Sequence, residues 1–176
     1  MSSERRQAGF TLLEIMVTMV LIGIIASFAV LSLPGKSPTE RLAGESRRLI
    51  AVLEMTQQDA LLRGDQRGVY FTETGYNLMA FQGGRGGRGG ANGFTSERAY
   101  QLPAGLRLQL WVEGRQVDFK KATADLPQVL LLSSGEMTSF TVIFDEADKM
   151  APYGSRTQNY RVDGDVTGRL AMEAMR

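Results

Sequence analysis

The 176-residue chain contains no cysteine and no histidine, and these two absences exclude most catalytic chemistry. Without cysteine there is no disulfide framework, no thiolate nucleophile and no cysteine-based zinc site. Without histidine there is no Ser-His-Asp or Cys-His catalysis and no imidazole metal ligand. The 20 basic and 19 acidic side chains nearly cancel, so no large basic field indicates nucleic-acid binding. We therefore expect a protein that is not an enzyme and that needs neither a metal nor a cofactor.

Charge is also absent from one long run near the N-terminus, residues 15–33. As an α-helix this run is about 28 Å long, close to the roughly 30 Å hydrocarbon core of a bilayer. Arg5 and Arg6 precede it, so the positive-inside rule places the N-terminus in the cytoplasm and residues 34–176 across the membrane. The sequence therefore predicts one membrane span here.

An acidic residue, Glu14, stands at the start of this apolar run. An ionised carboxylate there costs on the order of a few kcal/mol unless it is paired. We therefore expect a partner for Glu14. The alternative is that its carboxylate simply reaches the level of the lipid headgroups.

The residues around this carboxylate form a pattern: Arg5, Arg6, Gly9, Phe10 and Glu14, followed at once by the charge-free run. This pattern resembles the leader of type IV prepilins and pseudopilins. The resemblance implies cleavage between Gly9 and Phe10 by a prepilin peptidase and N-methylation of Phe10. It also implies that Glu14 pairs with the N-terminal amine of a neighbouring subunit during filament assembly. Such a pairing is physically reasonable, because an amine and a carboxylate attract strongly where water is scarce.

A second helix is predicted after the break at residues 34–38. Ser37 is a suitable N-cap, Pro38 fits the first helical position, and Glu40 completes a capping box. Gly64 is a suitable stop. An apolar stripe at helical spacing lies between them, formed by Leu42, Leu49, Ile50, Leu53, Ala60 and Leu61.

Alternating apolar residues and turn signals predict seven or eight short strands in the rest of the chain. The expected strand segments are 69–71, 76–81, 106–112, 117–119, 129–132, 140–144, 160–162 and 166–172. The run 129–132 is apolar throughout, which predicts a central strand. The predicted fold class is α+β, with a leader (1–9), a long N-terminal helix and an antiparallel β-sandwich-like domain (65–176). The helix has a transmembrane, filament-core half (10–33) and an amphipathic half (34–64).

Two segments of the β domain, residues 102–108 and 127–140, are similar to the GspH/FimT group of pilin-like proteins. The resemblance implies a minor pseudopilin of a type II secretion system, a structural subunit near the pseudopilus tip that supports export of folded exoproteins across the outer membrane. The implied partners are the major pseudopilin, other minor pseudopilins, the prepilin peptidase and an inner-membrane assembly platform. The implied location is the inner membrane, single-pass with a periplasmic domain, and the pseudopilus after assembly. Two alternatives stay open: a minor pilin of a type IV pilus, in assembly or DNA uptake, and a membrane-anchored binding module that never polymerises.

Several other patterns have an ordinary interpretation and a more specific one. The glycine-rich segment 83–93 is expected to be a surface loop, with partner or nucleic-acid contact as alternatives. The acidic stretch 145–148 and the segment 163–165 are expected to be solvated turns, with calcium binding as the alternative. Residues 133–135 hold two serines but have no histidine base. Trp111 is either an interface anchor or a packed side chain.

Overall fold

The structure is a computed structural model of the whole chain, and it describes residues 12–31, 37–83, 93–123, 126–146 and 159–175. In the first of these ranges, side chains are described as far as residue 27. The chain divides into an N-terminal unit, Met1–Ser37, and a globular unit, Pro38–Arg176. The predicted cleavage site at Gly9 and Phe10 lies outside the described residues, as does most of the predicted glycine-rich loop.

The described part of the N-terminal unit is helix α1, Leu12–Leu31. It forms from residues that are almost all apolar, and every described side chain on it is exposed. Within the described residues, no helix is both long and apolar enough to cross a membrane. The predicted span runs to Leu33, which is beyond these residues.

The globular unit begins with helix α2, Pro38–Arg63. The helix starts at the predicted first position and ends before Gly64, whose φ of 69° is the left-handed conformation that stops a helix. The predicted stripe is buried at Leu42, Leu49, Leu53 and Ala60. Leu61 is 48% exposed, so its place in the stripe was wrong. It follows Ala60 directly and is turned about 100° away from the buried face.

In the described residues, nine strands form two antiparallel sheets. The four-stranded sheet has the order β3-β2-β1-β6 and consists of β1 (Arg67–Thr72), β2 (Gly75–Gln82), β3 (Gly93–Gln101) and β6 (Val129–Leu131). The five-stranded sheet has the order β5-β4-β7-β8-β9 and consists of β4 (Leu106–Val112), β5 (Arg115–Gln116), β7 (Phe140–Glu146), β8 (Asn159–Gly164) and β9 (Leu170–Met175). The predicted α+β class is confirmed.

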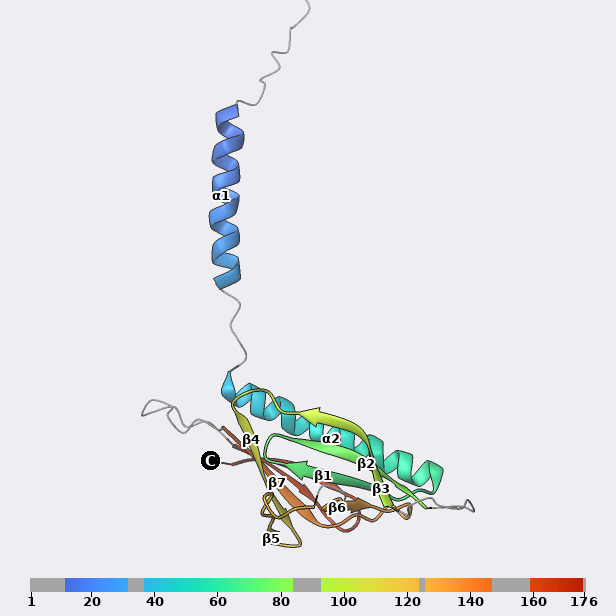
Figure 1. Cartoon of the computed structure of the whole chain (residues 1–176). Coiled ribbons are helices and arrows are strands. Elements are labelled where there is room, and N and C mark those ends of the chain that lie inside the picture. Colours follow the sequence, from blue (N-terminus) through green and yellow to red (C-terminus); the bar gives the residue numbers. More distant parts are fainter. Residues whose placement is uncertain (1–11, 32–36, 84–92, 124–125, 147–158, 176) are drawn as a thin grey trace, which may run out of the picture. The chain divides into compact units, whose positions relative to one another are not determined.

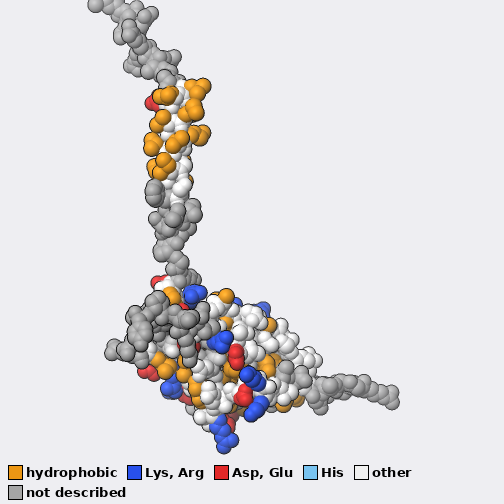
Figure 2. All heavy atoms as spheres, turned by 60° about the vertical axis from the view of Figure 1, so that its left-hand side comes forward, with side chains coloured by type: hydrophobic (Ala, Val, Ile, Leu, Met, Phe, Trp, Pro, Cys, Tyr) orange, Lys and Arg blue, Asp and Glu red, His pale blue; other side chains and the backbone are white. Residues whose placement is uncertain are grey.

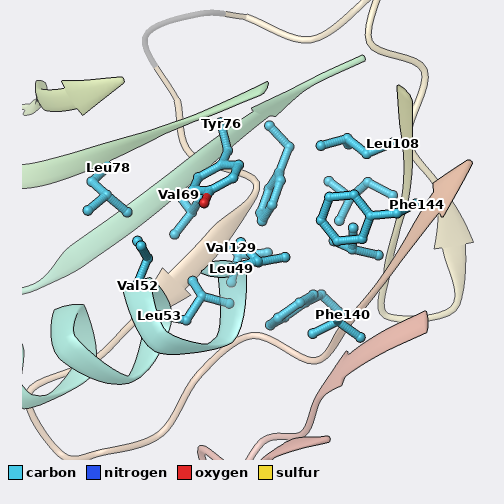
Figure 3. Close-up of a cluster of buried hydrophobic side chains, with 14 of the residues drawn as sticks. Leu49, Val52, Leu53, Val69, Tyr76, Leu78, Leu108, Val129, Phe140 and Phe144 are labelled. Atoms are coloured by element: carbon cyan, nitrogen blue, oxygen red, sulfur yellow. The ribbon is translucent and has the colours of Figure 1, made fainter. Parts of the chain in front are cut away.

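Helix α2 contacts strands of both sheets, so it closes the core between them (Figure 1). Leu49, Val52 and Leu53 project from this helix toward the aromatic rings of Tyr76 and Phe140 (Figure 3). The remaining core residues alternate along the strands, as burial on one face of each sheet requires.

Three strand predictions needed correction, besides the start of the last strand, which is Leu170 and not residue 166 because a turn occupies residues 166–168. The apolar run at 129–132 forms β6, which is an edge strand and not a central one; burial comes from α2 and from the turn that follows it. Residues 117–119 are not a strand, because β5 ends at Gln116 and Val117 and Phe119 pack on the core from a loop. Strand β3 was missed because the sequence from Gly93 to Gln101 shows no apolar alternation, and it forms instead by pairing with β2.

Candidate assembly surfaces

Helix α1 presents an apolar surface with Glu14 in its first turn. Leu12 is 78% exposed and Met19 is 70% exposed. The Thr18 hydroxyl donates to the Ile15 carbonyl at 2.9 Å, and the Ser27 hydroxyl donates to the Gly23 carbonyl at 2.8 Å. Both hydroxyls are therefore hydrogen-bonded within the helix. Figure 2 shows apolar side chains covering the described part of this helix.

This surface suits packing among apolar helices or lipid, where internal satisfaction of polar groups is required. Glu14 is the one charge in the sequence from residue 12 to residue 31. A carboxylate in the first turn of a helix is favoured by the partial positive charge of the helix N-terminus. The structure thus places the predicted assembly residue at the start of the exposed apolar helix.

The globular unit carries acidic and basic side chains interspersed over the face seen in Figure 2. One of its ion pairs involves a buried cation. The side chain of Arg67 on β1 is 5% exposed, lies 3.6 Å from the carboxylate of Asp65, and also pairs with Glu97 on β3. Glu97 sits at a bulge, where the β2–β3 register shifts. A bulge re-aims a side chain, and here the re-aimed carboxylate reaches a buried cation. Sequence patterns gave no signal for this cluster.

A shallow pocket of about 480 Å³ lies beside the end of β7, lined by Glu73, Arg107, Asp118, Asp145 and Glu146 among others. Glu146 lies 3.8 Å from Arg41 of α2. Across the described ranges, no group of three or more potential ligand residues is placed to hold a metal ion. Asp148, the third carboxylate of the calcium alternative, lies outside these ranges, and residues 145 and 146 belong to β7.

The turn between β8 and β9 is organised by Asp165. Its Oδ1 accepts hydrogen bonds from the Thr167 hydroxyl at 2.6 Å, the Thr167 N–H at 2.8 Å and the Arg169 N–H at 3.1 Å. The hydrogen bond from the Thr167 hydroxyl is the largest cause that lowers the pKa of this carboxyl, followed by the Arg169 N–H. The turn was predicted at residues 163–165, but Asp163 and Gly164 belong to β8. The turn instead begins at Asp165, and its donors are directed at this single carboxylate.

Trp111 projects from β4 on the face opposite Leu108 and Leu110, as its alternation predicts. It is half-buried and lies across from Gln116 and Thr141. At 133–135, the Ser134 hydroxyl donates to Glu136 at 3.3 Å within an exposed turn, which is an ordinary turn contact.

The chain was compared with known proteins. Residues 5–30 match the family described as the prokaryotic N-terminal methylation motif. Type II secretion system protein H of Pseudomonas aeruginosa is 30% identical over 145 residues, covering 77% of this chain and 81% of that protein. The protein of the same name from Aeromonas hydrophila is 28% identical and covers 96% of this chain and 94% of its own length.

Solved structures of the same group share the fold. The crystal structure of the minor pseudopilin EpsH from the type II secretion system of Vibrio cholerae has a TM-score of 0.60 at 20% identity. It covers 80% of this chain and 98% of its own. The solution structure of Escherichia coli GspH has a TM-score of 0.57 at 17% identity, over 78% of this chain and 91% of that one.

A methylation motif that includes an exposed apolar helix, followed by a two-sheet domain closed by a second helix, defines a pseudopilin: a membrane-anchored, pseudopilus-forming subunit. The chain belongs to the type II secretion system protein H family. It is a minor pseudopilin, and it interacts with other pseudopilins.

Proposed function

We propose that the chain is cut between Gly9 and Phe10 by a prepilin peptidase, methylated at Phe10, and assembled near the tip of the pseudopilus. The span 10–33 holds it in the inner membrane with the globular unit in the periplasm, and the inner-membrane assembly platform then takes it up. It acts there as a structural subunit and not as an enzyme, supporting export of folded exoproteins across the outer membrane.

The observation that carries this proposal is the match of residues 5–30 to the methylation motif, which includes most of a helix whose described apolar side chains are exposed. The type II secretion system core protein G of Dickeya chrysanthemi is 42% identical over 59 residues, 32% of this chain and 39% of that protein. This similarity to a core protein of the type II secretion system supports the major pseudopilin as a partner. The carboxylate of Glu14 then pairs with the new amine of a neighbouring subunit.

Deletion of the gene tests the function. We expect folded exoproteins to accumulate in the periplasm while twitching motility and DNA uptake stay normal. Normal secretion with loss of twitching or uptake would instead favour the type IV pilus alternative. Normal behaviour of the deletion strain in all three assays, with uncleaved protein in the membrane of the parent strain, would favour a binding module that does not polymerise.

Replacement of Glu14 tests the assembly residue. We expect Glu14→Ala protein to be cleaved and inserted, yet to restore exoprotein release no better than the deletion strain. Thr18→Ala is the matched control, because its hydroxyl bonds within the same helix, and it should restore release fully. Full release with Glu14→Ala would contradict the pairing.

A further inference from the structure

An edge strand leaves half of its backbone N–H and C=O groups unpaired, so a sheet edge is a place where a strand from another chain can add. The globular unit has four such edges, formed by β3 and β6 in one sheet and by β5 and β9 in the other. Natural proteins usually protect edges with bulges, charges, very short strands or covering loops. Three of the four edges have such protection among the described residues.

Each of the three protected edges has a different kind of protection. Strand β6 is covered by the following turn, where Thr138 N–H donates to the Leu130 carbonyl at 2.9 Å and Leu130 N–H donates to the Thr138 hydroxyl at 3.1 Å. Strand β5 has only two residues. Strand β3 is interrupted by its bulge and carries the charged pair Glu97 and Arg98 next to it.

Strand β9 has none of these devices in the part of the chain that the structure describes. It pairs with β8 at all six positions, from Gly164↔Leu170 to Asn159↔Met175, without a register shift. Its sequence, LAMEAM, holds one charge and no proline. It is therefore a regular and mostly apolar edge.

The turn before β9 determines which backbone groups of this strand face β8 and which face outward. Asp165 N–H donates to the Arg169 carbonyl at 3.0 Å, and bonded and non-bonded pairs alternate along an antiparallel ladder. The backbone groups of Ala171 and Glu173 therefore face β8, and those of Leu170, Met172 and Ala174 face outward. Within the described ranges, none of the backbone hydrogen bonds outside the strand ladders involves these last three residues.

The charge of the edge indicates the kind of strand that fits. Glu173 lies opposite Arg161 in the β8–β9 register, but Nη2 of Arg161 is 2.7 Å from Oδ1 of Asp163 instead. Among the ion pairs of the described residues, none involves Glu173. A cation on an added strand, directly across from Glu173, would be stabilising.

A second copy of β9 does not supply that cation. In an antiparallel pairing of two β9 strands centred on Met172, Glu173 lies opposite Ala171 of the second copy. A shift to the next allowed register places the two Glu173 side chains opposite each other, which is unfavourable. A register centred on Ala171 brings Arg169, which precedes β9, opposite Glu173, but it pairs only residues 170–172 of the two strands. A strand of different sequence, which can pair along the whole edge and supply the cation, is therefore favoured over self-pairing.

We propose that the outer edge of β9 accepts an extended strand from another pseudopilin subunit, apolar at alternate positions and with Lys or Arg opposite Glu173. This inference rests on the proposed function, since it assumes assembly with other subunits. The added strand bonds to the outward backbone groups of Leu170, Met172 and Ala174 and extends the five-stranded sheet.

The test uses the full-length chain in the deletion strain, with a photo-cross-linking amino acid in place of Met175 on the outer face of β9. The same amino acid in place of Arg115, at the opposite edge of the sheet, is the positional control. Ala174→Pro removes one outward N–H without touching the bonds to β8, and Ala174→Thr is its control because it keeps that N–H. Glu173→Lys reverses the charge of the edge, and Glu113→Lys makes the same charge change in the β4–β5 turn.

We expect cross-linking from position 175, but not from 115, to another pseudopilin subunit. Loss of a backbone hydrogen bond or of the charge match should lower the yield about tenfold in Ala174→Pro and Glu173→Lys. Exoprotein release should fall with it, while Ala174→Thr and Glu113→Lys behave as the wild type. If Ala174→Pro lowers the melting temperature of the purified full-length chain, its effect reflects lost stability, and the inference is then tested with Glu173→Lys only.

Three results would overturn the inference: a cross-linked pair of two copies of this chain, no cross-link from position 175, or a cross-link and release that both edge variants leave unchanged. Failure of the proposed function gives a different pattern. In that case the deletion strain itself secretes normally, whereas failure of the edge alone leaves the deletion strain defective and the edge variants competent.

Discussion

At the scale of single residues, a column of aromatic rings joins the core to the surface beside α2. Tyr76 stacks on Tyr100 with ring centroids 5.0 Å apart, and the Arg48 guanidinium lies 5.1 Å above the Tyr100 ring. The Tyr76 hydroxyl is buried and has no hydrogen-bond partner among the described residues. Burial raises the pKa of this hydroxyl well above its ordinary value. The ring stabilises the fold and the hydroxyl opposes it.

Replacing Tyr76 by Phe removes the unsatisfied hydroxyl and keeps the ring. We expect the free energy of unfolding to rise by about 1 kcal/mol, because a buried polar group without a partner costs roughly 1–3 kcal/mol. Chemical denaturation measures this. Tyr100→Phe is the control, since its hydroxyl accepts only a 3.4 Å bond from Arg98, and it should change stability by less than about 0.5 kcal/mol. A loss of stability in Tyr76→Phe would show that the hydroxyl is satisfied.

Asp165 makes the β8–β9 turn sensitive to acid. Its pKa is lowered in the folded state, so its contribution to stability is present above the unfolded value of about 3.9 and is lost as pH falls through the folded value. Asp165→Asn should therefore be less stable than the wild type at pH 6, and the difference should shrink in acid. Denaturation of both proteins from pH 6 to pH 2 measures it. A difference that does not vary with pH would contradict this account.

At the scale of elements, α2 is the piece that both sheets share. Leu53 is fully buried between them, whereas Leu62, less than three turns further along, is 85% exposed. One helix therefore offers a core leucine and a surface leucine in nearly the same backbone context.

Leu53→Ala should lower the free energy of unfolding by about 2–5 kcal/mol, because it removes buried methyl groups and leaves a cavity. Leu62→Ala should change it by less than about 0.5 kcal/mol. Urea denaturation of the two variants gives the comparison. Equal effects would mean that α2 does not hold the sheets together through this face.

At the scale of the whole molecule, the chain separates into an N-terminal unit and a globular unit at Ser37–Pro38. Among the described residues, the hydrophobic core consists of residues from Leu42 onward. A domain with its own core can fold alone.

The fragment Pro38–Arg176 should therefore be folded, with a melting temperature close to that of the same unit in the full chain. Circular dichroism and thermal unfolding measure this. The fragment should fail to restore exoprotein release in the deletion strain, because it lacks Glu14 and the apolar helix. An unfolded fragment would show that the N-terminal unit contributes to the fold.

Sequence alone determined the features that depend on local chemistry. The start of α2 at Pro38 and its end at Gly64 follow from capping and left-handed backbone preferences, and β4 and β7 follow from strict alternation. The leader residues Gly9, Phe10 and Glu14 were likewise predicted from a short motif, and their roles stay predictions. The absence of histidine and cysteine, which the sequence also shows directly, excluded most kinds of catalytic chemistry.

Only the tertiary structure decided the features that depend on distant neighbours. Strand β3 has no apolar alternation and forms because β2 pairs with it. Strand β6 is apolar although it lies at the edge of its sheet, because α2 and the following turn bury its side chains. The pairing of buried Arg67 with Glu97 needs a bulge 30 residues along the chain. The open edge of β9 is also invisible in sequence, since an edge is defined by the strand that is not beside it. Such features arise from long-range pairing, which local sequence patterns do not encode.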